Sequence, residues 1–175
     1  MEITRRQLLD SIEQEARTSF QSASLTGLLR AGPRSTTAVV KERFGDLGRR
    51  LGCKVAAAGF KHADEGEWLY DMVWYLLENG LMTRQLMVLE SEWKHGVVIA
   101  QNAEVDGDFQ KLVQARADVR VWISSSHNPT LAQQHLANCK KQVESFSGSQ
   151  SGDAYVFIIN DWTTPTTIIE RFELR

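Results

Sequence analysis

The segment WLYDMVWYLLENGLMTRQLMVLESEWK, residues 68–94, decides the fold of this chain. Its two apolar runs, residues 68–77 and 85–94, are rich in aromatic and aliphatic side chains, which is typical of β-strands. Asn79 and Gly80 lie between the runs, and this pair favours the tight turn of a β-hairpin. The segment therefore predicts two successive strands that pair with each other.

The elements on both sides of this hairpin predict an α/β fold. Val40, Phe44, Leu47 and Leu51 form one apolar stripe at helical spacing, so a helix is expected before the first strand. The order helix, three strands, helix, strand, helix, two strands predicts a mixed central β-sheet flanked by helices. The expected elements are a helix over 37–51, strands over 54–60, 68–77 and 85–94, a helix over 107–117, a strand over 119–124, a helix from 128, and strands over 154–160 and 166–174.

The N-terminal residues are predicted to form a helical arm that precedes the core. Leu8, Leu9, Ile12 and Ala16 recur at helical spacing, and the break RAGPRSTT at residues 30–37 follows them. The chain has 175 residues, which is the length of one domain. We therefore expect a single domain, with the arm at 1–34, the core at 35–126, and a C-terminal helix and strands at 127–175.

The composition is that of a globular protein, with 42% hydrophobic and 24% charged residues. The sequence has no apolar run long enough for a membrane span, no secretory signal, and two cysteines, so we expect a cytoplasmic protein with free thiols and no membrane partner. The net charge is −2, but residues 1–61 carry eleven Lys and Arg against six Asp and Glu. This asymmetry is compatible with a polyanion held near a carboxylate site, and equally with solvated helix surfaces.

Several common catalytic signatures are absent from the sequence. The four histidines lack the spacing of zinc ligands, and no P-loop or GxGxxG motif is present. Three serines at 124–126 end a predicted strand without a GxSxG motif. The sequence therefore argues against zinc, phosphate-loop and serine-nucleophile chemistry.

Acidic residues in the two central strands are the candidates for a functional site. Asp71 lies inside an apolar run, where an unpaired carboxylate would be costly, so a metal, a cation or several N–H donors must compensate for it. Glu90, Glu92 and Lys94 alternate with apolar residues, so they project from one face of a strand, roughly 6.6 Å apart. A divalent cation would make such like charges tolerable, because it takes several carboxylate oxygens. The pattern therefore predicts a Mg²⁺ site built on two strands.

Asp71 on the second strand, followed by Glu92-Trp93-Lys94 on the third, resembles the motif of the PD-(D/E)XK nuclease superfamily, whose restriction-endonuclease-like core has the order αβββαβ. The resemblance implies that Asp71 and Glu92 bind Mg²⁺, with Mn²⁺ as a substitute and the Trp93 carbonyl as a third ligand. It implies that Lys94 orients the attacking water and stabilises the transition state. The implied function is hydrolysis of phosphodiester bonds in nucleic acid, with DNA preferred to RNA, and with a homodimer where both strands are cut.

Two features of the motif leave its assignment open. Glu90 is an extra acid on the same face, and it is an alternative primary ligand with Asp71. In that case Lys111, on the following helix, replaces Lys94 as the essential lysine. The superfamily often adds a polar residue from this helix, for which Lys111 and Gln114 are candidates. Glu42 is the candidate for an acid from the first helix, but its helical position is expected to face solvent.

Two other functions also remain open. The first is a catalytically inactive protein of the same fold that binds nucleic acid or another protein. The second is an unrelated α/β domain, in which the acids pair with arginines such as Arg116 or Arg120.

Overall fold

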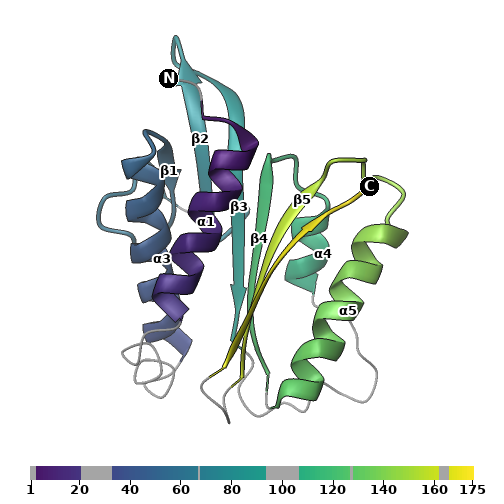
Figure 1. The fold of residues 1–175 in the computed structure, drawn as a ribbon. Helices are drawn as coiled ribbons and strands as arrows, with labels where there is room; N and C mark the ends of the chain where they lie inside the picture. Colours follow the sequence, from purple (N-terminus) through teal and green to yellow (C-terminus); the bar gives the residue numbers. More distant parts are fainter. Residues whose placement is uncertain (1–2, 21–32, 67, 94–106, 127, 162–165) are drawn as a thin grey trace.

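A computed structural model describes residues 3–20, 33–66, 68–93, 107–126, 128–161 and 166–175. In these residues four helices lie against a six-stranded sheet (Figure 1). The elements are α1 (Arg5–Phe20), α3 (Pro33–Arg50), β1 (Lys54–Ala56), β2 (Met72–Glu78), β3 (Leu81–Glu92), α4 (Gly107–Val113), β4 (Val119–Ser126), α5 (Pro129–Ser145), β5 (Ala154–Asp161) and β6 (Thr167–Glu173).

The strands lie in the sheet in the same order as in the sequence, from β1 to β6. β1, β2 and β3 form an antiparallel meander, and β5 and β6 are also antiparallel. β3, β4 and β5 run parallel, and α4 and α5 occupy the crossovers between them. The predicted mixed sheet with flanking helices is therefore confirmed.

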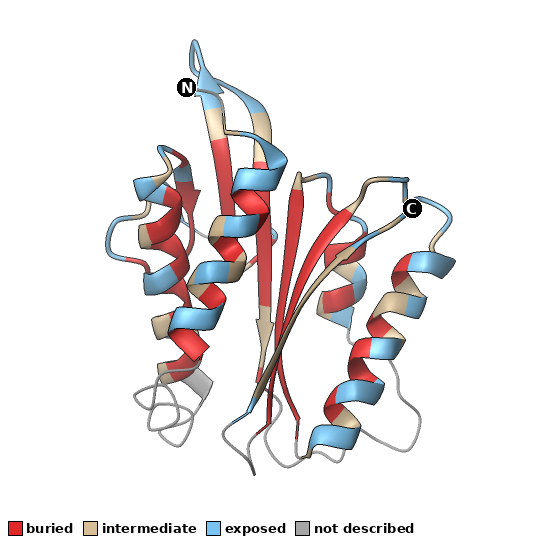
Figure 2. Ribbon diagram, viewed as in Figure 1, coloured by how far each residue is buried: buried red, intermediate tan, exposed pale blue. Residues whose placement is uncertain are grey.

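The two faces of the sheet are covered by different helices, and each face has its own apolar core. Trp74 and Leu89 point toward α1 and α3, whereas Trp122 and Phe157 point toward α4 and α5. The middle of the sheet is buried on both sides, while each helix is exposed on its outer surface (Figure 2). No helix in the described part of the chain has the length and apolar character needed to cross a bilayer.

The N-terminal helix that we expected before the core forms, and its apolar stripe is packed into one of the two core clusters. Leu8, Leu9, Ile12 and Ala16 are at most 2% exposed, because α1 lies across the sheet beside α3 (Figure 1). Arg171 on β6 adds ion pairs with two acids of α1. The apolar stripe was read correctly, but the stripe alone did not show which surface it covers.

The β2–β3 hairpin forms as predicted. Asn79 and Gly80 have φ values of 53° and 79°, and they connect the register pair Glu78 and Leu81. Positive φ at both central residues is the requirement of a type I′ turn. The turn sets the register at its own end of the hairpin, and two register shifts, between Leu76 and Leu77 and between Trp74 and Tyr75, then determine which residues meet at the far end.

The strand and helix limits differ from the predicted ones near the candidate site. β1 ends at Ala56 rather than at residue 60, and β2 begins at Met72, so Asp71 lies just before the strand and not inside it. α4 ends at Val113 rather than at residue 117, because the N–H of Ala115 bonds to the carbonyl of Leu112 in a tighter final turn.

Gly48 on α3 allows the helix to approach the sheet closely. A Cβ at this position would lie 2.7 Å from Trp74 Nε1, and Trp74 is fully buried. Gly48→Ala is therefore expected to lower the free energy of unfolding by about 1–3 kcal/mol through overpacking, less the small gain in helix propensity. Urea denaturation of this variant checks the expectation. Gly66→Ala is the matched control, because a Cβ there meets no atom within 4 Å; equal stability of the two variants would contradict it.

Candidate active site

Asp71 is held at the start of β2 by contacts from β3 and α3. Its Oδ2 accepts hydrogen bonds from the backbone N–H of Ser91 at 2.9 Å and from the Ser91 hydroxyl at 2.8 Å. Its Oδ1 lies 3.5 Å from Nζ of Lys41, a buried lysine on α3. Two hydrogen-bond donors and one ammonium group therefore hold the carboxylate in place. Together they compensate for the cost of its partial burial.

Glu90 lies near the end of β3, and its side chain is 6% exposed. Its Oε1 forms an ion pair with Nζ of Lys111 on α4, and Lys111 also lies 3.3 Å from Asp108. The Lys111 ammonium is 5.8 Å from the centre of the Tyr70 ring, which covers the pair. A buried acid is thus neutralised by a lysine from the helix on the same face of the sheet.

Burial and neighbouring charges shift the acid–base behaviour of this pair. Burial raises the pKa of Glu90 from 4.5 to about 7; the Lys111 hydrogen bond opposes this rise, and the charge of Asp71 adds to it. Burial lowers the pKa of Lys111, but the hydrogen bond to Glu90 outweighs burial and leaves that pKa above its ordinary value. Asp71 and Glu90 are therefore close enough to repel each other, although their lysines come from opposite faces of the sheet.

The structure places the remaining predicted site residues around this group. Glu92 is the last residue of β3, half-buried and opposite Ser124 on β4. The Trp93 side chain is buried in the core on the α1 and α3 side. Lys94 lies outside the described residues. In the described residues Lys111 pairs with Glu90 and the charge of Asp71 acts on Glu90, as expected for the alternative with Glu90 as the primary acid.

Buried polar groups without partners lie beside the site, at the carboxyl ends of β4 and β5. The hydroxyls of Ser124 and Ser125 and the Nδ2 of Asn160 have no hydrogen-bond partner in the described structure. Ser125 and Asn160 are register neighbours, and Ser124 pairs with Glu92. Such groups are rare in folded proteins.

Sequence reasoning missed Lys41 and Ser91. Lys41 follows Val40 of the apolar stripe, and the sequence alone did not show that α3 would bring its ammonium group to Asp71. Ser91 gave no signal, because a serine between two glutamates is unremarkable at a strand end. Glu42 is exposed, as expected for a residue that faces solvent, and Gln114 bonds to Gln110 rather than to the acids.

The acids at this site pair with lysines. The alternative in which Arg120 compensates for them was wrong, because Arg120 pairs with Asp153. The other arginine of that alternative, Arg116, is exposed and carries no described ion pair to either acid. Asp71 and Glu90 are instead compensated by Lys41 and by Lys111.

The donor set suits Mg²⁺ rather than a softer metal. The described residues contain no group of three or more His, Cys, Asp or Glu side chains arranged to hold a metal. Mg²⁺ needs fewer protein ligands than this, because it is usually bound by one or two carboxylates together with water and substrate phosphates. Asp71 and Glu90 are two carboxylates of the kind that such a site uses, and the charge of Asp71 raises the pKa of Glu90.

The raised pKa of Glu90 predicts a pH-dependent stability. The folded state holds a proton on this carboxyl between pH 4.5 and about 7, where the unfolded state has lost it. The contribution of this group to the free energy of unfolding is therefore greatest at low pH. It falls by up to about 3 kcal/mol as the pH rises to about 7. Glu90→Gln should remove this loss, which urea denaturation at pH 5 and pH 8 measures. Parallel pH profiles for the two proteins would contradict the prediction.

Comparison of the chain with family models, with curated proteins and with solved structures found no match.

Proposed function

We propose that this protein is a metal-dependent nuclease of the PD-(D/E)XK type, which hydrolyses phosphodiester bonds in nucleic acid, with DNA as the preferred substrate. The observation that carries the proposal is the convergence of Asp71, buried Glu90 and Lys111 at the ends of two paired strands. The element order supports it, since α3, β1–β3, α4 and β4 follow the sequence helix, three strands, helix, strand.

In this proposal each residue of the group has a separate role. Asp71 and Glu90 hold the cation, while Ser91 and Lys41 fix the orientation of Asp71. Lys111, already at Glu90, places its ammonium beside the bound phosphate, where it stabilises negative charge and orients the attacking water. Bound Mg²⁺ supplies Lewis-acid stabilisation of the charge that builds on the phosphate oxygens.

The groups at the ends of β4 and β5 suit the same substrate. The unpartnered hydroxyls of Ser124 and Ser125 and the amide of Asn160 are hydrogen-bond donors, and phosphate oxygens are acceptors. Ligands of open α/β sheets bind outside the carboxyl ends of the parallel strands, which is where these residues lie. In this proposal a nucleic-acid strand crosses this edge of the sheet, beside these buried polar groups.

A second candidate function is a catalytically inactive protein of the same fold that binds nucleic acid or a protein partner. One observation favours it: Asp71 and Glu90 are each already neutralised by a lysine, so neither needs a metal for charge balance. In this case the acidic group is a structural element of the sheet edge.

Incubation of the purified chain with linear, plasmid and single-stranded DNA, in Mg²⁺, Mn²⁺ or EDTA, separates the two functions. The nuclease predicts cleavage in either metal and none in EDTA. The binding protein predicts salt-sensitive DNA binding without cleavage. Neither cleavage nor binding on any DNA or on RNA would rule out both functions.

A further inference from the structure

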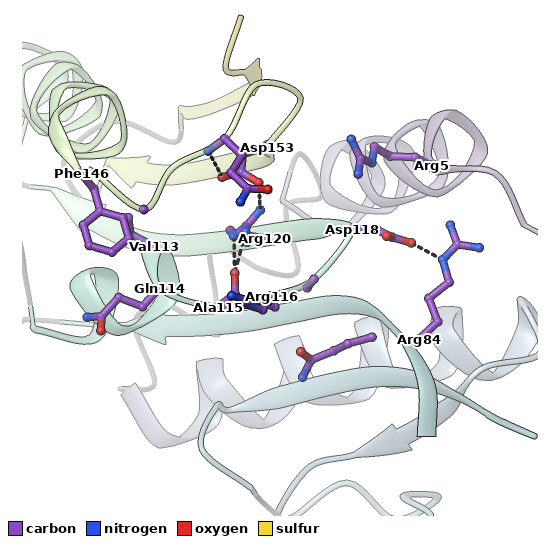
Figure 3. Close-up of a pocket in the computed structure, with 14 residues that line it drawn as sticks. Arg5, Arg84, Val113, Gln114, Ala115, Arg116, Asp118, Arg120, Phe146 and Asp153 are labelled. Atoms are coloured by element: carbon purple, nitrogen blue, oxygen red, sulfur yellow. Dashed lines mark hydrogen bonds and ion pairs between the residues drawn. The ribbon is translucent and has the colours of Figure 1, made fainter. Parts of the chain in front are cut away.

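An open pocket of about 480 Å³ lies at the amino-terminal ends of β4 and β5. Figure 3 shows the residues that line it. Its wall comes from the start of α1, from β3, and from the loops that follow α4 and α5. The volume lies within the range of about 300–1,000 Å³ typical of small-molecule sites. Gln85 on its wall precedes Glu90 by five residues, which corresponds to about 17 Å along the strand. The pocket is therefore separate from the proposed active site.

Four arginines line the pocket, and two of them are neutralised by carboxylates. Arg84 Nε donates to Asp118 Oδ2 at 2.6 Å, and Arg120 Nη1 lies 3.2 Å from Asp153 Oδ1. Both pairs are drawn in Figure 3. These two arginines consequently add no net charge to the pocket.

The other two arginines leave excess positive charge. Arg5 Nη1 donates to the carbonyl of Gly152 at 2.7 Å, which positions the guanidinium but does not offset its charge. Arg116 is exposed, and it has no ion pair in the part of the chain that the structure describes. Two uncompensated guanidinium groups on one pocket attract an anion.

Arg120 is fixed in the wall of the pocket by contacts within the chain. It is 5% exposed, and its Nε and Nη2 both donate to the carbonyl of Ala115, at 3.0 and 2.6 Å. Its guanidinium also lies over the Tyr155 ring. Nη1 takes part in no described hydrogen bond, in spite of the nearby Asp153. Arg120 is therefore a buried structural part of the wall, and the excess charge of the pocket comes from Arg5 and Arg116.

We propose that this pocket binds a small organic molecule through a phosphate monoester group. A phosphate monoester carries a charge of about −1.5 to −2 at pH 7, which matches the two uncompensated guanidiniums of Arg5 and Arg116 better than a single carboxylate does. The guanidinium group of an arginine can donate two parallel hydrogen bonds to two oxygens of one phosphate. Gln114 and Gln150 on the wall offer amide groups to the polar remainder of the molecule.

Isothermal titration calorimetry in EDTA, with adenosine 5′-monophosphate as the probe and adenosine as its phosphate-free counterpart, tests the proposal. The monophosphate should bind and adenosine should not. Arg5→Gln and Arg116→Gln should each weaken binding about tenfold or more, since each removes a charge-assisted hydrogen bond. Arg6→Gln is the control, because Arg6 is an exposed neighbour of Arg5 that does not line the pocket.

Three results would overturn the proposal. The first is that the monophosphate binds no more tightly than adenosine does, which includes the case in which neither compound binds. The second is equal weakening by Arg6→Gln, which would indicate general charge attraction. The third is loss of binding in Asp71→Asn, which would place the nucleotide at the proposed active site. Because the assay contains EDTA and measures no cleavage, its result does not depend on the nuclease proposal.

Discussion

Asp71→Asn is expected to lower the rate of metal-dependent DNA cleavage by at least about 100-fold while the fold stays intact. The asparagine keeps an oxygen that accepts the hydrogen bonds from Ser91, so the local structure has its main support. It loses the negative charge that a divalent cation requires. Single-turnover cleavage rates and thermal midpoints of the variant and the wild type measure the two effects separately.

Asp10→Asn is the matched control for this variant. Asp10 is an exposed acid on α1 that pairs with Arg171, far along the sheet from the proposed site, and its substitution makes the same chemical change. Its cleavage rate should equal that of the wild type. Cleavage by Asp71→Asn within threefold of the wild-type rate would exclude Asp71 as a metal ligand.

Lys111→Met is expected to lower cleavage by about 10²–10³-fold, because it removes the ammonium placed beside the phosphate. It should also raise the pKa of Glu90 further, since the Lys111 hydrogen bond and charge are what lower that pKa in the wild type. Any residual activity should therefore require a higher pH than wild-type activity. A pH–rate profile from pH 6 to pH 9 measures both the loss and the shift.

Lys140→Met is the control for the lysine. Lys140 also forms an ion pair with a glutamate, Glu170, and its side chain is 27% exposed against 29% for Lys111. It lies on α5, and its loss should leave cleavage unchanged. Lys94→Met completes the comparison. A greater loss of cleavage activity in Lys94→Met than in Lys111→Met would identify Lys94 as the catalytic lysine.

Much of the fold could be predicted from local patterns. The turn at Asn79 and Gly80 requires positive φ at both residues. Few residue pairs adopt this conformation as readily as Asn-Gly does, so the hairpin was predictable. The same holds for α5, where the Asn128 side chain accepts from the N–H of Leu131 and Pro129 starts the helix. These signals act within a few residues of each other, and no tertiary contact competes with them.

The parts that sequence did not predict depend on contacts between distant residues. Asp71 was expected inside a strand because apolar residues surround it, but its bonds to Ser91 hold it just before β2. The sequence also did not show which acid α4 faces, and in the structure Lys111 pairs with Glu90. Lys41 became visible as a charge partner only when α3 was placed on the sheet.

Titration of the wild-type chain and of Asp71→Asn with Mn²⁺ by calorimetry, at pH 6 and at pH 8, tests the central claim most directly. A cation held between Asp71 and Glu90 predicts saturable binding by the wild type, at least about tenfold weaker in the variant. Binding should be tighter at pH 8 and should release a proton near pH 7, because Glu90 must ionise to bind the metal. Equal affinity in the two proteins, or no binding to the wild type, would contradict the claim.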